Sequence, residues 1–153
     1  MNATAIFAAE VSAAVIVRRT IAATAEDLFD AWLDPEALAT WMRPSEIQTT
    51  TASIDPRVGG RYQIDMQGPT ERYPHTGVYR TIDRPRRLVF TWISRGTDQK
   101  ESLVTVDFLP KGERTEVIVM HELLADGARP SHEKGWSSAL ETLEQFHRKG
   151  ATR

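Results

Sequence analysis

The stretch that decides the fold is Thr115–Gly150, which reads TEVIVMHELLADGARPSHEKGWSSALETLEQFHRKG. Val117, Val119 and His121 alternate in its first part, and residues two apart on a strand share one face of a sheet. Asp126-Gly127 and Pro130 then interrupt the pattern, as turn residues do. The stretch therefore predicts a last strand, a short loop and a closing helix.

The closing helix is predicted to run from Ser131, a suitable N-cap, to Lys149, with Gly150 ending it. Spacings of three and four residues place one set of side chains on a single face. That face comprises Trp136, Ala139, Leu140, Leu143, Phe146 and His147. A long helix with such a face needs an apolar surface to cover.

Strand-like segments upstream supply that surface. Tyr62, Ile64 and Met66 alternate with polar residues, which is typical of a strand with one buried face. The predicted strands span residues 47–54, 62–66, 77–82, 88–92, 104–108 and 117–121. Short breaks rich in Gly, Pro and Asp separate them, so we expect an antiparallel meander rather than parallel βαβ units.

The segment before the meander predicts one more strand and two short helices. The β-branched run from Val11 to Ile21 favours a strand. Thr24 is suited to cap a helix that reaches Trp32, and Asp34-Pro35 is suited to start a second one that ends near Trp41. The predicted class is therefore α+β, with helices on one face of a sheet.

The chain has 153 residues, which indicates one domain, predicted over residues 11–153 after a flexible extension over residues 1–10. The formal net charge is -2, so the basic excess of a nucleic-acid binder is missing. The sequence contains no Cys, which excludes disulfides and thiolate chemistry. We expect a cytoplasmic protein without a membrane span, because no stretch approaches about 20 apolar residues.

Several short motifs, taken in their order and spacing, resemble a known family. They are FDAW at 29–32, DPE at 34–36, WMRP at 41–44, GGRY at 59–62, PRRLVFTW at 85–92, TEV at 115–117 leading to His121, and HEKGW at 132–136. Together they are similar to the homologues of the activator of the heat-shock-protein-90 ATPase (AHSA-type), within the START-like, or SRPBCC, superfamily. The resemblance covers nearly the whole chain, from about Val15 to Phe146.

This resemblance implies a helix-grip fold, in which a curved antiparallel sheet wraps around a long C-terminal helix. Two short helices follow the first strand, and an apolar cavity lies between sheet and helix. Superfamily members bind apolar or amphipathic small molecules in that cavity. A chaperone partner is implied by family analogy alone, and we expect a monomer or homodimer.

The leading hypothesis is that an apolar or aromatic small molecule binds in the cavity. The candidate ligand-binding residues are Trp41, Tyr62, Ile64, Met66, Tyr79, Phe90, Trp92, His121, Trp136 and Leu140. Aromatic side chains among these residues offer apolar area together with polar groups.

An enzymatic function is the second hypothesis, and it depends on one residue, His121. His121 is in phase with Val117 and Val119 and should face the interior, where a histidine can act as general acid or base. The alternative is a structural histidine bonded to a neighbouring hydroxyl or carbonyl group. Other motifs fail, because His121-Glu122 lacks the second histidine of a zincin and no G-x-S-x-G elbow occurs. We predict no metal and no cofactor.

Overall fold

The computed structural model describes residues 14–151, so the extension predicted over residues 1–10 lies outside them. Seven antiparallel strands form one sheet in the order β1-β7-β6-β5-β4-β3-β2. The strands are β1 (Val15–Ile21), β2 (Thr49–Ile54), β3 (Arg61–Gln67), β4 (Arg72–Asp83), β5 (Arg87–Ser94), β6 (Ser102–Lys111) and β7 (Arg114–Glu122). Strands β2 to β7 form a meander, and β1 joins its far edge beside β7.

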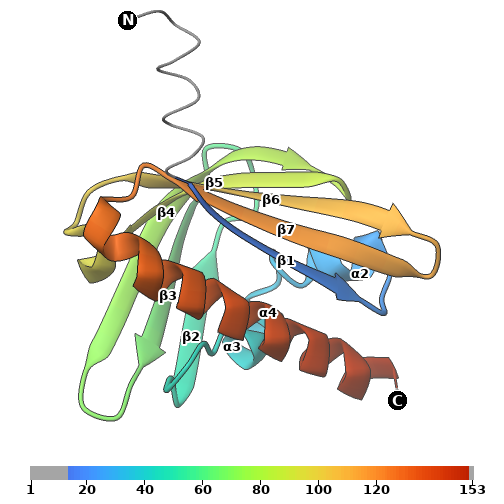
Figure 1. The fold of residues 1–153 in the computed structure, drawn as a ribbon, viewed down its shortest axis with the longest axis horizontal. Coiled ribbons are helices and arrows are strands. Elements are labelled where there is room, and N and C mark those ends of the chain that lie inside the picture. The colour runs from blue at the N-terminus through green and yellow to red at the C-terminus, as the bar shows by residue number, and fades with distance from the viewer. Residues whose placement is uncertain (1–13, 152–153) are drawn as a thin grey trace, which may run out of the picture.

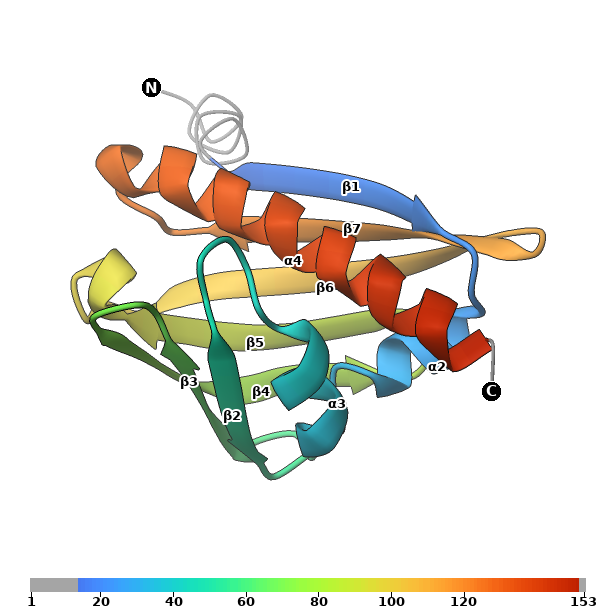
Figure 2. The same cartoon turned by 90° about the horizontal axis from the view of Figure 1, so that it is seen from below.

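One long helix, α4 (Arg129–Ala151), crosses the concave face of the curved sheet (Figure 1). Two short helices, α2 (Ala25–Asp30) and α3 (Pro35–Trp41), lie on the same side (Figure 2). Short 3-10 helices, η1 (Arg95–Thr97) and η2 (Asp126–Ala128), follow β5 and precede α4. The predicted helix-grip architecture is confirmed.

The predicted starts of both short helices are also confirmed. The Thr24 hydroxyl accepts the backbone N–H of Asp27 at 3.1 Å, and the Asp34 carboxylate accepts that of Glu36 at 3.0 Å. Each side chain binds one of the amide groups that a helix leaves unpaired in its first turn. Local sequence chemistry is therefore sufficient to start α2 and α3.

Several predicted boundaries were wrong. Strand β4 begins at Arg72 rather than Gly77, so it continues through Pro74. Helix α4 begins at Arg129, and the hydroxyl of Ser131 donates to the Ala128 carbonyl instead of capping the helix. The 3-10 turn η2 runs directly into α4, and the backbone N–H of Arg129 donates to the Asp126 carbonyl. The helix also extends to Ala151, past the stop predicted at Gly150.

The core lies between the concave face of the sheet and α4. Aligned residues of five neighbouring strands form one row across that face, namely Val15, His121, Val104, Phe90 and Tyr79. All five are buried, as are Leu140 and Leu143 of α4. Because the sheet curves away from the helix toward β2 and β3, one end of this interface is left unfilled.

Candidate functional site

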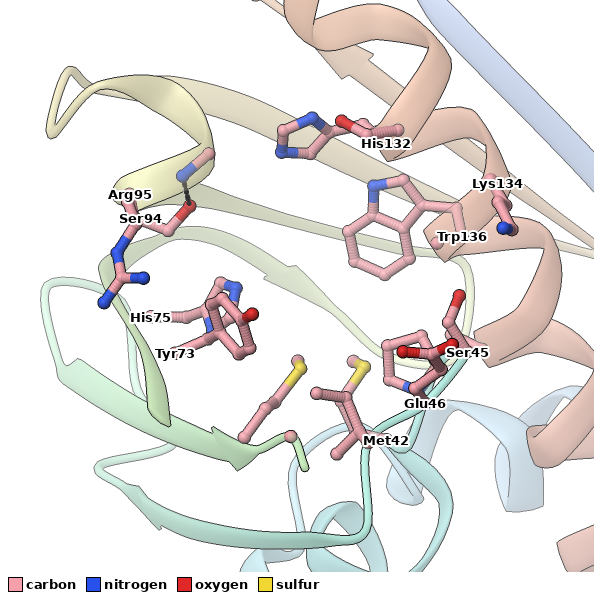
Figure 3. A pocket seen from close by; sticks show the side chains of 18 of the residues that line it. Met42, Ser45, Glu46, Tyr73, His75, Ser94, Arg95, His132, Lys134 and Trp136 are labelled. Atoms are coloured by element: carbon pink, nitrogen blue, oxygen red, sulfur yellow. Dashed lines mark hydrogen bonds between the residues drawn. The ribbon is translucent and has the colours of Figure 1, made fainter. Parts of the chain in front are cut away.

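A cavity of about 710 Å³ occupies the unfilled end. Figure 3 shows its walls, which come from the N-terminal part of α4, η1, β4 and the loop after α3. The lining residues are Met42, Pro44, Ser45, Glu46, Ile47, Met66, Gly68, Pro69, Tyr73, His75, Trp92, Ser94, Arg95, Gly96, Ser131, His132, Lys134, Gly135, Trp136 and Ala139.

The floor of the cavity is apolar. Met42, Met66, Trp92, Trp136 and Ala139 are all buried. The rings of Trp92 and Trp136 lie 5.2 Å apart between centroids, so a strand and the helix meet there through two indoles. Two methionines beside two indoles make a surface that adapts to an apolar molecule, because a methionine side chain is flexible and polarisable.

The rim carries charges that nearly balance. Arg95 pairs with Glu71 at 3.2 Å and lies over the ring of Tyr73, 5.3 Å from its centroid. Lys134 and Glu46 make no ion pair with any residue between 14 and 151. With respect to residues 14–151, the lining therefore includes one exposed cation and one exposed anion without an ion pair, Lys134 and Glu46 (Figure 3).

The loop after α3 is tied to α4 and forms one wall. Ser45 has a positive φ of 54°, and its backbone N–H donates to the Ser138 hydroxyl at 2.7 Å. The Thr142 hydroxyl donates to the Trp41 carbonyl at 2.6 Å. These two bonds hold a strained turn against the helix, at the point where the lining begins.

His121 lies behind Trp136 and is fully buried, outside the set of residues that line the cavity. The Trp136 indole N–H donates to Nδ1 of His121 at 3.0 Å. Nε2 of His121 lies 2.8 Å from the Ser102 hydroxyl, whose proton is donated to the Trp92 carbonyl at 2.6 Å. An indole can only donate, so the imidazole proton must be on Nε2.

This chain of bonds holds His121 neutral. Burial, with the nearby His132 as a smaller cause, lowers the pKa of His121 from 6.5 to about 3. Both ring nitrogens are already bonded to protein groups, and neither faces the cavity. His121 is therefore bonded as expected for a structural histidine. This bonding opposes a role in proton transfer to a molecule in the cavity.

Two other histidines line the cavity. His132 is partly buried, and its Nδ1–H donates to the Ala128 carbonyl at 2.7 Å, which leaves Nε2 as a proton acceptor in the neutral ring. His75 lies on β4, with its ring centroid 4.7 Å from that of Trp92. Burial lowers the pKa of His75 from 6.5 to about 4, so this ring is neutral at pH 7.

The structure brings together three of the ten sequence candidates at the cavity, namely Met66, Trp92 and Trp136. Tyr62, Ile64, Tyr79 and Phe90 lie deeper, around an inner space of about 10 Å³ that Met42 and Trp92 separate from the cavity. Trp41, His121 and Leu140 line neither space. The Trp41 indole donates to the Ala31 carbonyl at 2.9 Å and packs in the core.

Sequence reasoning missed most of the lining because those residues lie in turns and at the ends of elements. Alternation along a strand shows which face is buried. The curvature of the sheet decides which end of that face the helix leaves uncovered, and alternation does not reveal it. One signal was available, since Tyr73 and His75 continue the phase of Gly77 and Tyr79 along β4. Pro74 obscured that continuity.

The described residues hold no group of three or more histidine and carboxylate side chains placed to bind a metal ion. None of the helices between residues 14 and 151 is long and apolar enough to cross a membrane.

The fold and its cavity define a START-like, helix-grip protein. The family described as "Activator of Hsp90 ATPase homolog 1-like protein" matches residues 22–148, so the chain belongs to that family. None of the curated proteins compared with the chain matches it significantly.

Solved structures share the fold. A protein from Rhodobacter sphaeroides is 25% identical, with a TM-score of 0.77 over 89% of this chain and 93% of that one. A protein from Nitrosomonas europaea is 19% identical, with a TM-score of 0.77 over 92% and 97%. One described as an HSP90 activator, from Plasmodium falciparum, is 23% identical, with a TM-score of 0.70 over 87% and 94%. Family and fold support a ligand-binding or co-chaperone-like module.

Proposed function

We propose that the protein binds an apolar or aromatic small molecule in the cavity between the sheet and α4. The observation that carries this proposal is a space of about 710 Å³ with a buried floor of methionine and tryptophan. Small-molecule sites in proteins commonly have about 300–1,000 Å³ and a mostly apolar lining. Met42, Met66, Trp92 and Trp136 are the residues proposed to contact the ligand.

Five of the remaining sequence candidates pack behind the residues that line the cavity. Tyr62, Ile64, Tyr79 and Phe90 pack under Trp92, and His121 fixes the indole of Trp136. A cavity enzyme that uses His121 as acid or base is the weaker proposal, because that ring is neutral, buried and fully bonded. We therefore propose binding without His121 chemistry.

Filling the cavity tests the proposal. Gly135 lines it from α4, and a Cβ placed there meets no atom within 4 Å. Gly135→Phe should fit the helix and occupy part of the space. In a thermal-shift screen of lipids and aromatic compounds, a ligand at about 100 times its Kd should raise the Tm of the unaltered chain by about 5–10 °C. The Phe variant should show less than half of that shift.

Gly135→Ala is the matched control, because it improves the helix without filling the cavity. It should keep the ligand response while raising the melting temperature of the free protein. If no compound in the screen stabilises the unaltered chain, or if Gly135→Phe responds in full, the proposal fails.

A co-chaperone-like interaction is the alternative that the family description favours. Such a role would use the outer surface, so Gly135→Phe should leave it intact. A pull-down with the full chain that recovers no Hsp90-type chaperone would contradict it.

A further inference from the structure

The four tryptophans differ in what their indole N–H groups bind. Trp41 donates to the Ala31 carbonyl and Trp136 donates to His121. The indole nitrogens of Trp32 and Trp92 are buried and have no hydrogen-bond partner among residues 14–151. Of these two, Trp92 lines the cavity and Trp32 does not.

A second unpaired nitrogen lies beside Trp92. Nδ1 of His75 is buried and has no hydrogen-bond partner among residues 14–151. The two rings are 4.7 Å apart between centroids, and both belong to the cavity wall. The cavity wall thus contains an indole donor and a neutral imidazole whose unpaired nitrogens are buried just behind its surface.

An unpaired buried donor destabilises a protein, and a ligand that supplies an acceptor recovers that loss. A ligand oxygen would reach the Trp92 indole nitrogen after a small shift of neighbouring side chains. Met42 and Met66 belong to the same floor and are flexible enough to allow it. The surroundings disfavour a charged oxygen, because an ionised group loses its hydration in an apolar site. The balanced rim of Lys134 and Glu46 gives no compensating field.

We propose, on the basis of the proposed function, that the occupant is an uncharged apolar molecule with a hydroxyl or carbonyl oxygen at its buried end. Trp92 Nε1–H donates to that oxygen. A hydroxyl group at that position also lies next to the neutral imidazole of His75. Hydrocarbons without an oxygen and ionised carboxylic acids are the classes that this wall discriminates against.

Three matched probes separate these classes: naphthalene, 2-naphthol and 2-naphthoate. In equilibrium dialysis at pH 7 the unaltered chain should bind 2-naphthol about three- to tenfold more tightly than naphthalene, the range that one hydrogen bond contributes. The carboxylate should bind most weakly. Trp92→Phe should reduce the preference for naphthol to less than about twofold, while Trp32→Phe, which removes the other unpaired donor, should keep it.

If Trp92→Phe folds poorly, a measurement on the unaltered chain tests the same hydrogen bond. With ¹⁵N-labelled tryptophan, the indole signal of Trp92 should shift downfield with 2-naphthol and not with naphthalene, and the Trp41 signal should stay in place. Equal binding of naphthalene and naphthol, or tighter binding of naphthoate, would overturn the inference while leaving the proposed function intact. Failure of all three probes to bind would contradict both.

Discussion

The indole N–H of Trp136 donates to Nδ1 of His121 across 3.0 Å, and this bond joins the closing helix to the last strand. It also divides the interior, because Trp136 faces the cavity while His121 lies behind it. The residue that sequence analysis singled out for chemistry therefore holds the wall of the site.

Removing the imidazole should destabilise the fold. In His121→Phe the Trp136 N–H loses its acceptor, and we expect a loss of about 1–3 kcal/mol in the free energy of unfolding. A double-mutant cycle with Trp136→Phe, measured by urea unfolding, should give a coupling energy of about 1 kcal/mol or more. Additive effects of the two substitutions would show that the bond contributes nothing.

Stability should fall as the pH drops below about 6.5, the ordinary pKa of histidine. Burial lowers the pKa of His121 to about 3 and that of His75 to about 4, so below pH 6.5 the unfolded chain binds protons that the folded chain does not. As the pH falls, each histidine then lowers the free energy of unfolding by up to about 1.4 kcal/mol per pH unit, until the pH reaches the pKa of that histidine in the folded state. Above pH 6.5 both histidines are neutral in the folded and the unfolded chain, so this loss of stability is absent.

Urea unfolding between pH 7.5 and 5 measures this effect, in a range where most carboxylates remain ionised. His75→Gln should reduce the slope of stability against pH by roughly half, since one of the two groups is removed. A slope equal to that of the unaltered chain would mean that His75 titrates normally in the folded state.

Gly77 should tolerate no side chain. A Cβ there would lie 2.0 Å from the Thr91 carbonyl oxygen and 2.6 Å from the Tyr62 ring, whose hydroxyl donates to the same carbonyl at 2.5 Å. Gly77→Ala should cost about 1–3 kcal/mol, as overpacking does. Gly127→Ala is the control, because a Cβ at residue 127 meets no atom within 4 Å. Equal melting temperatures for the two variants would contradict the close approach.

Ser138 should affect the ligand more than the fold. Ser138→Ala removes the acceptor of the Ser45 N–H, which is exposed and can bind water instead, so we expect less than about 1 kcal/mol of destabilisation. The strained turn at Ser45 loses its tie to α4, and a bound ligand should dissociate faster. Stopped-flow release of 2-naphthol from both proteins measures this, with Ser137→Ala as the control. An unchanged release rate would show that the bond between Ser45 and Ser138 does not slow dissociation of the ligand.

The sequence by itself determined the elements and their order. Thr24 and Asp34 cap the short helices through atoms only two or three residues away. The alternation of Tyr62, Ile64 and Met66 set the buried face of β3, because a strand places every second side chain on one side. These are local relationships, and local spacing is sufficient to predict them.

Only the tertiary structure decided which buried residues line the cavity. Trp41, Trp92 and Trp136 are equally apolar in the sequence, yet Trp41 packs in the core and the other two face the open space. The difference arises from the curvature of the sheet and from the angle at which α4 crosses it. The role of His121 was likewise fixed by Trp136 and Ser102, which are 15 and 19 residues away. Periodicity places a side chain on a face, but packing between distant elements decides what that face meets.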